Sequence, residues 1–96
     1  MTTETGTVPT IHASRYLQQL AKHWAHKFKV TFTPNQARIE LPFGVVEMTA
    51  TAEALSARLI TAADEDAARA RQVFEEHINR FAFREAPLLL AWDRVS

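Results

Sequence analysis

Apolar residues recur along this chain with two periods, one typical of helices and one typical of strands. In residues 14–30, SRYLQQLAKHWAHKFKV, apolar positions are spaced by three and four, as on one buried stripe of a helix. The stripe comprises Leu17, Leu20, Ala21, Trp24 and Phe28. Ser14 stands just before it, and we expect its hydroxyl to cap the helix by accepting from an amide of the first turn.

The opposite face of this predicted helix is basic. Its members are Arg15, Lys22, His26 and Lys29, flanked by His23 and Lys27. No acidic residue occurs in the segment, and the lysines near its end suit the negative end of the helix dipole. The helix is therefore expected to be apolar on one side and basic on the other.

A second helical pattern covers residues 64–83. Its apolar stripe contains Ala67, Ala70, Phe74, His77, Ile78 and Phe81. Three acids at its start, Asp64, Glu65 and Asp66, complement the positive end of the helix dipole and offer a cap. The helix is expected to end before Pro87, because a residue that precedes proline is disfavoured in helical conformation.

Alternation with period two predicts six strands. The first, in residues 7–11, contains Pro9 and is therefore expected at an edge or a bulge. Four more occupy residues 29–33, 37–41, 45–50 and 55–61, and the apolar run of residues 88–92 predicts a buried last strand. Residues 55–60 also contain good helix formers, but their alternation favours a strand.

Two local features complete the expected chain path. Gly44 follows the break at Pro42 and Phe43, and we expect it to be free to take a positive φ. Residues 1–5 are polar and are expected to be disordered.

The element order β-α-β-β-β-β-α-β predicts an α+β fold in one domain spanning residues 1–96. Two helices with one apolar stripe each should cover one face of an antiparallel-dominated sheet, which gives a two-layer sandwich. The initial strand, helix and strand favour parallel pairing of the two strands that flank the helix. The central meander is expected to be antiparallel.

Composition narrows the classes of function. The 96 residues carry a formal net charge of zero, so no global attraction to nucleic acid or to an anionic membrane is expected. Cysteine is absent, which excludes disulfides, thiolate metal ligands and a cysteine nucleophile. No apolar run approaches the roughly 20 residues that span a bilayer, and the N-terminus lacks signal-peptide features, so a cytoplasmic location is expected.

Charge is segregated along the sequence despite the neutral total. Residues 12–30 contain four Lys and Arg residues and no acid, whereas residues 47–76 contain seven acids against three arginines. Most aromatic residues lie on the apolar stripes and are expected in the core, which argues against an aromatic nucleic-acid platform.

Three blocks, SRYLQQLAKHWAHKF, IELPFG and HINRFAFRE, resemble in order the bacterial domain-of-unknown-function family 2218. The resemblance extends from about Thr7 to Asp93. This family has no established activity. Its members tend to be encoded beside, or fused to, siderophore-interacting flavin-dependent ferric reductases. The resemblance therefore implies a role near iron acquisition and such a reductase as a partner.

Histidines are the candidate metal ligands. His23 and His26 form an H-x-x-H pair on the first helix, and His77 or a glutamate could complete a metal or haem site. Lys22 and Lys27 argue against a bound cation, so the alternative is two surface histidines. His77 falls on the apolar stripe of the second helix, which favours a core histidine over a pocket histidine.

Basic residues that end the second helix offer an anion site. Arg80 and Arg84 can bind a carboxylate or phosphate, or can meet the helix dipole and neighbouring acids. We predict that Lys22, His23 and His26 lie near these two arginines and form one ligand-binding patch.

These features favour a non-catalytic binding or accessory module for iron or siderophore handling, without a cofactor, over an enzyme. The expected partner is the flavin-dependent reductase or an anionic small molecule, and neither nucleic acid nor a membrane. The alternative is a small histidine-based metal- or haem-binding protein or enzyme.

Overall fold

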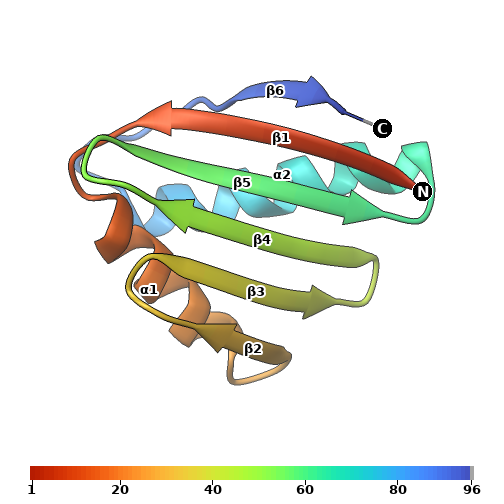
Figure 1. The fold of residues 1–96 in the computed structure, drawn as a ribbon, viewed down its shortest axis with the longest axis horizontal. Coiled ribbons are helices and arrows are strands. Elements are labelled where there is room, and N and C mark those ends of the chain that lie inside the picture. The colour runs from red at the N-terminus through yellow and green to blue at the C-terminus, as the bar shows by residue number, and fades with distance from the viewer. Residues whose placement is uncertain (96) are drawn as a thin grey trace.

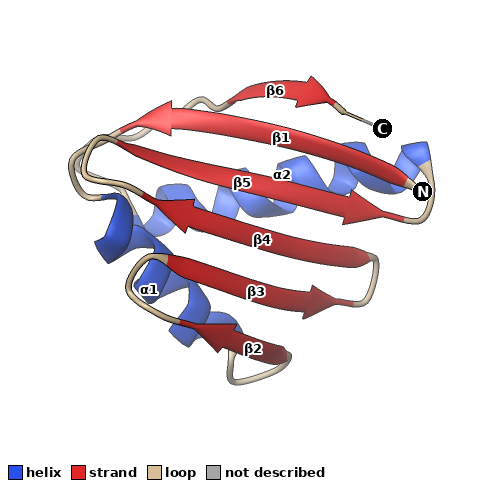
Figure 2. Ribbon diagram, in the orientation of Figure 1, coloured by secondary structure: helices blue, strands red, loops and turns tan. Residues whose placement is uncertain are grey.

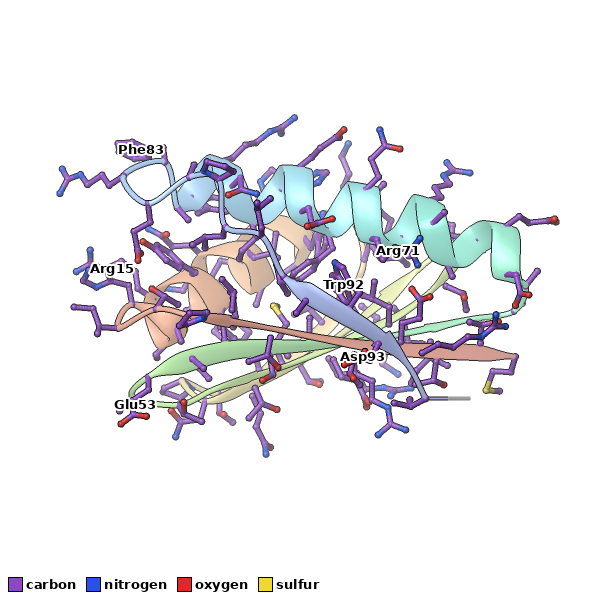
Figure 3. All side chains as sticks on the ribbon, turned by 90° about the horizontal axis from the view of Figure 1, so that it is seen from above. Arg15, Glu53, Arg71, Phe83, Trp92 and Asp93 are labelled. Atoms are coloured by element: carbon purple, nitrogen blue, oxygen red, sulfur yellow. The ribbon has the colours of Figure 1, made fainter. Side chains whose placement is uncertain are left out.

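A six-stranded antiparallel sheet carries two helices on one face. The computed structural model describes residues 1–95, and it shows the α+β two-layer architecture expected from the sequence (Figures 1 and 2). The elements are β1 (Thr2–Pro9), α1 (Ala13–Trp24), β2 (Lys29–Phe32), β3 (Gln36–Leu41), β4 (Gly44–Ala50), β5 (Ala54–Thr61), α2 (Asp64–Phe81) and β6 (Ala91–Arg94). A view from above shows both helices on the same side of the sheet (Figure 3).

The strand order is β2-β3-β4-β5-β1-β6, and every neighbouring pair is antiparallel. The expected parallel pairing of β1 with β2 is therefore wrong. The two strands point the same way but are separated by β3, β4 and β5, because the meander folds back and returns β5 beside β1 (Figure 1). Helix α1 crosses beneath those strands to reach the far edge of the sheet.

The N-terminal residues are ordered, contrary to the expectation for residues 1–5. Strand β1 begins at Thr2 and pairs with β5 along its whole length, from Thr2 opposite Thr61 to Pro9 opposite Ala54. Thr2 is buried, and its hydroxyl donates to the Asp64 carboxylate at 2.6 Å. The polar residues at the start of the chain thus belong to strand β1 and not to a disordered tail.

Helix α1 is shorter than its sequence pattern suggests and does not include Phe28. It ends at Trp24, where the amide of Phe28 still donates to the Trp24 carbonyl at 2.9 Å, and β2 begins at Lys29. Ser14 is not its cap: the cap position is His12 without a side-chain bond. The Ser14 hydroxyl instead donates to the carbonyl of Pro34 at 2.6 Å and so ties α1 to the β2–β3 turn.

Helix α2 begins at Asp64, with the three expected acids in its first turn, and ends at Phe81. None of these acids caps it through a side-chain hydrogen bond. Asp64 accepts a hydrogen bond from Thr2 of β1 and forms an ion pair with Arg94 of β6, so it links the start of α2 to both of these strands. Phe83 lies beyond the helix and is exposed.

The last strand is an edge strand, which corrects the expectation of a buried strand in residues 88–92. Leu88 and Leu90 are buried but precede β6, and β6 itself pairs only with β1. Trp92 lies over Gly6, where a Cβ atom would come within 2.6 Å of the indole ring. Gly6 is therefore needed for this close packing of strand and ring.

Gly44 has a negative φ, contrary to expectation. A Cβ atom at Gly44 would collide with the carbonyl oxygen of Ile60 on the neighbouring strand β5. The glycine is required here by the close approach of two backbones and not by a left-handed turn conformation.

The core lies between the helices and one face of the sheet. Each strand alternates, so that Val46, Met48 and Ala50 of β4 face the helices while the residues between them face away. The largest fully buried side chains are Phe74, Leu17, Leu20, Ile39, Met48, Leu55, Leu59 and Ile78. The opposite face of the sheet is covered by no element in residues 1–95 (Figure 3).

Candidate functional site

Two histidines meet where α1 crosses α2. The ring centroid of His23, near the end of α1, lies 5.8 Å from that of His77 on α2 and 5.8 Å from that of Phe81. The buried Trp24 lies 5.1 Å from His77, centroid to centroid. Since both helices bury their stripes on the same sheet face, their remaining sides touch and bring together residues more than 50 positions apart.

His77 is half-buried and oriented by its own helix. Its Nδ1 lies 2.7 Å from the carbonyl oxygen of Val73. Because a carbonyl only accepts, Nδ1 carries a proton in this hydrogen bond, and Nε2 faces away from it. His77 therefore combines features of the core histidine and of the pocket histidine considered from the sequence. Its ring packs against the buried Trp24 and also lies beside the exposed His23.

Exposed cations surround this pair of rings. We define the helix-side basic surface as Lys22, His23, His26, Lys27 and Arg80. Within residues 1–95, no carboxylate comes within 4 Å of the charged nitrogens of Lys22, Lys27 or Arg80. None of these three cations is therefore in a direct ion pair within the described part of the chain.

The pKa of His23 reports this local excess of positive charge. Partial loss of water around the ring lowers its pKa from the ordinary value of 6.5, and nearby positive charge lowers it further. These charges belong, in decreasing order of effect, to His77, Arg80, His26 and Lys27. His23 thus lies between the cations of the turn after α1, His26 and Lys27, and Arg80 of α2.

Arg84 lies apart from the other four predicted site residues. Its charge acts on Tyr16 in the first half of α1, together with that of Arg15, and its guanidinium stacks over Phe83 at 5.7 Å. The chain has left α2 at Phe81 and turned towards the start of α1 (Figure 3). The structure thus brings His23, His26 and Arg80 into one region, whereas Lys22 is not among the charges that act on His23 and Arg84 lies elsewhere.

A carboxylate cluster near the start of α1 was not identified from the sequence. The Tyr16 hydroxyl donates to Glu85, and the Thr10 hydroxyl lies 3.1 and 3.0 Å from the two oxygens of the same carboxylate. The Thr10 hydroxyl oxygen also accepts from the amide of His12 at 3.1 Å. A tyrosine on the apolar stripe was the available signal, but its partner lies 69 positions away.

The two titratable groups of this cluster shift in opposite directions. The hydrogen bond from Tyr16 lowers the pKa of Glu85 below its ordinary value of 4.5, with Thr10 and His12 adding to the effect. Burial, and then the hydrogen bond and charge of Glu85, raise the pKa of Tyr16 above 10.0. The cluster therefore favours the ionised carboxylate and the neutral phenol, and it fastens the segment after α2 to α1.

The histidines do not form a recognisable metal centre. Among residues 1–95, no group of three or more His, Cys, Asp or Glu side chains is arranged to hold a metal ion. His23 meets His77 across the helices, and the neighbouring cations oppose a further positive charge. The arrangement fits an anion better than a cation or a haem iron.

Membrane insertion through a helix finds no support in residues 1–95, because neither α1 nor α2 combines the length and apolar character that a span requires.

Comparison with known proteins places the fold in a bacterial family. The model of a family described as uncharacterised proteins conserved in bacteria, domain of unknown function 2218, matches residues 5–93. The NMR structure of PA4090 from Pseudomonas aeruginosa is similar, with a TM-score of 0.81 and 31% identity over 97% of this chain and 96% of that chain. No curated protein matches the sequence. The chain therefore belongs to domain-of-unknown-function family 2218.

Proposed function

We propose that this protein is a non-catalytic binding module that engages an anionic partner through the helix-side basic surface. The observation that carries the proposal is the grouping of Arg80 of α2 with His26 and Lys27 of the turn after α1 around His23, with no carboxylate in residues 1–95 within 4 Å of the charged nitrogens of Lys27 or Arg80.

Uncompensated charge of this kind favours association more than stability. Opposite charge on a partner accelerates encounter and fixes orientation, and salt screens the effect over about 10 Å at 0.1 M. The exposed aromatic edge formed by His23 and Phe81 adds a less polar contact within the same area. We expect a phosphate or carboxylate group of the partner to lie beside His23 and Arg80.

The partner that we propose to test first is a siderophore-interacting, flavin-dependent reductase. The support for it is the association of such reductases with the family that the sequence resembles, together with the requirement for an anionic surface. Inorganic phosphate and small carboxylates serve as minimal probes of the same surface.

A ¹H–¹⁵N NMR titration at low salt tests this proposal. Phosphate, citrate and the purified reductase are added in turn, and amide shifts are expected to centre on residues 22–27 and 77–81. The variant Lys22→Gln is expected to weaken binding, whereas the matched variant Lys29→Gln removes the same charge at strand β2 and is expected to have no effect. Shifts confined to other elements, or no shifts with any probe at low salt, would show that the surface is not a binding site.

A further inference from the structure

The uncovered face of the sheet is hollowed. The hollow has a volume of about 720 Å³ and extends from β1 across β5 and β4 to the β2–β3 turn. Figure 3 shows this face on the side away from the helices, with only side chains beyond the strands. Its volume lies within the range of small-molecule sites, about 300–1,000 Å³.

Strand register arranges polar side chains of the hollow in two rows. One row runs Arg38, Glu47, Arg58 and Thr5, because these residues are direct cross-strand neighbours on β3, β4, β5 and β1. The adjacent row runs Gln36, Thr49, Ser56 and Thr7. One row therefore supplies charge, and the other supplies hydroxyl and amide groups.

The charged row leaves one guanidinium free. Arg38 binds Glu47 with 3.0 Å between Nη1 and Oε2, whereas no carboxylate in residues 1–95 lies within 4 Å of the charged nitrogens of Arg58. Two arginines against one glutamate give the hollow a positive balance. A guanidinium fork matches a carboxylate through two parallel hydrogen bonds.

The hydroxyl groups are also largely free. Thr7 and Ser56 are 3.1 Å apart, oxygen to oxygen, and each keeps further hydrogen-bonding capacity. The hydroxyls of Thr5, Thr31 and Thr49 make no hydrogen bond to the part of the chain that the structure describes. Threonine and serine hydroxyls can donate and accept, which suits a ligand that carries several hydroxyls of its own.

We propose that this hollow binds a small polyhydroxylated carboxylate, of the chemical class of sugar acids. The carboxylate lies on Arg58, and the ligand hydroxyls lie against Thr5, Thr7, Thr49 and Ser56. This site is separate from the helix-side basic surface, since it lies on the opposite face of the sheet (Figure 3). It can therefore exist whether or not that surface binds a partner.

A small ligand fits this face better than a protein does. The cores of protein interfaces are enriched in aromatic and other large apolar side chains. Phe32, at one end of the hollow, is the aromatic residue among those that line it, and Met48 is turned towards the core. The centre of the hollow instead presents hydroxyls and a guanidinium, each of which can form hydrogen bonds to one polar group of a ligand.

NMR titration with D-glucuronate, with D-glucose as the neutral match, tests the site. Glucuronate is expected to shift amides of β1, β4 and β5 around Thr5, Thr49 and Ser56, with glucose much weaker. Arg58→Gln is expected to weaken glucuronate binding by about tenfold, as loss of one charged contact does. Arg69→Gln is the control, because it removes one positive charge from the exposed side of α2, outside both proposed sites.

Each other outcome overturns the proposal. If glucose and glucuronate cause equal shifts, or if Arg58→Gln binds glucuronate as well as wild type, Arg58 does not bind the carboxylate. Shifts confined to residues 22–27 and 77–81 would assign the carboxylate to the helix-side basic surface. If no amide shifts up to the solubility limit of glucuronate, the hollow is not a binding site. Arg58 is exposed, so its replacement should preserve the fold, which the ¹⁵N spectrum itself verifies.

Discussion

Charged side chains are arranged differently on the two sides of this sheet. On the open side, strand register interleaves charges of opposite sign, with Lys29 3.8 Å from Glu40 and Arg38 3.0 Å from Glu47. On the helix side, His26 and Lys27 of the turn after α1 and Arg80 of α2 lie near His23, whose pKa is lowered first by burial and then by these charges. The open side therefore pairs most of its charges and leaves Arg58 without an acid within 4 Å, whereas the helix side groups cations without such pairs.

The difference comes from the geometry of the elements. Cross-strand neighbours in an antiparallel sheet lie about 5 Å apart, so opposite charges in register meet directly. Two helices that pack side by side on a sheet bury their apolar stripes against it and leave their outer residues to solvent. Exposed ion pairs contribute only about 0–1 kcal/mol each, so the contrast concerns recognition more than stability.

Truncation of Trp24 should have the largest effect on the free energy of unfolding, because it removes the contact of Trp24 in α1 with His77 in α2. Trp24 is 4% exposed and packs against His77, which supports the crossing of α1 and α2. Trp24→Ala is expected to lower the free energy of unfolding by about 3–5 kcal/mol, as large-to-small core substitutions do. Urea denaturation followed by circular dichroism measures it.

The matched control for this variant is Phe83→Ala, which removes an aromatic ring that is 69% exposed. It is expected to change the free energy of unfolding by less than about 0.5 kcal/mol. Similar denaturation midpoints for the two variants would mean that the helix crossing does not stabilise the fold.

The carboxylate cluster should give an intermediate effect that depends on pH. Hydrogen bonds from Tyr16 and Thr10 lower the pKa of Glu85, so their stabilisation is full above pH 4.5 and is lost as pH falls through the lowered value. Tyr16→Phe is expected to reduce the free energy of unfolding at pH 7 by about 1 kcal/mol. The measurement is urea denaturation at a series of pH values.

Asp64 supplies the control for acid sensitivity. Its pKa is also lowered, by hydrogen bonds from Thr2 and Arg94, so part of the loss of stability in acid persists in Tyr16→Phe. The difference between wild type and Tyr16→Phe is therefore expected to shrink on acidification below about pH 4. A difference that stays constant with pH would show that Tyr16 acts through packing alone.

The smallest effect concerns His23 and tests the charge contrast directly. Arg80→Gln is expected to raise the pKa of His23, because it removes a positive charge that disfavours the protonated ring. An NMR pH titration of the ring protons measures this shift. Lys29→Gln serves as the control and should leave the pKa unchanged, since Lys29 lies on β2 beside Glu40.

Added salt should act in the same direction as Arg80→Gln. Screening of the surrounding cations raises the pKa of His23 towards 6.5. Bound phosphate should raise it further, since an anion favours the imidazolium. A pKa that is insensitive to Arg80, salt and phosphate would contradict the view that the helix side presents uncompensated charge.

Periodicity in the sequence was sufficient for most of the fold. The stripe from Leu17 to Trp24 and the alternation around Val46 and Met48 are local patterns, and a buried face follows from them directly. Helical spacing also placed Lys22 and His23 correctly on an exposed side of α1, but His26 lies in the turn after Trp24, because α1 ends earlier than the sequence pattern predicts.

The sequence misjudged features that depend on distant neighbours. Thr2 and Thr3 are polar and look like part of a loose end, but pairing with β5 buries them. Ser14 looks like a cap, but its hydroxyl has a better partner at Pro34. The prediction that β1 pairs with β2 was wrong, because the strand order depends on which strand of the meander lies beside β1, and that strand is β5.

The tertiary structure alone decided which charged groups share a surface. The crossing of α1 and α2 brings Arg80 near His23, while the turn after Phe81 carries Arg84 and Glu85 to Tyr16 at the other end of α1. Strand register alone placed Arg58 between Glu47 and Thr5. The amino-acid sequence determined which residues are buried and which are charged, because those properties follow from local periodicity. Their partners lie up to 92 positions away, and only packing of the whole chain brings such residues into contact.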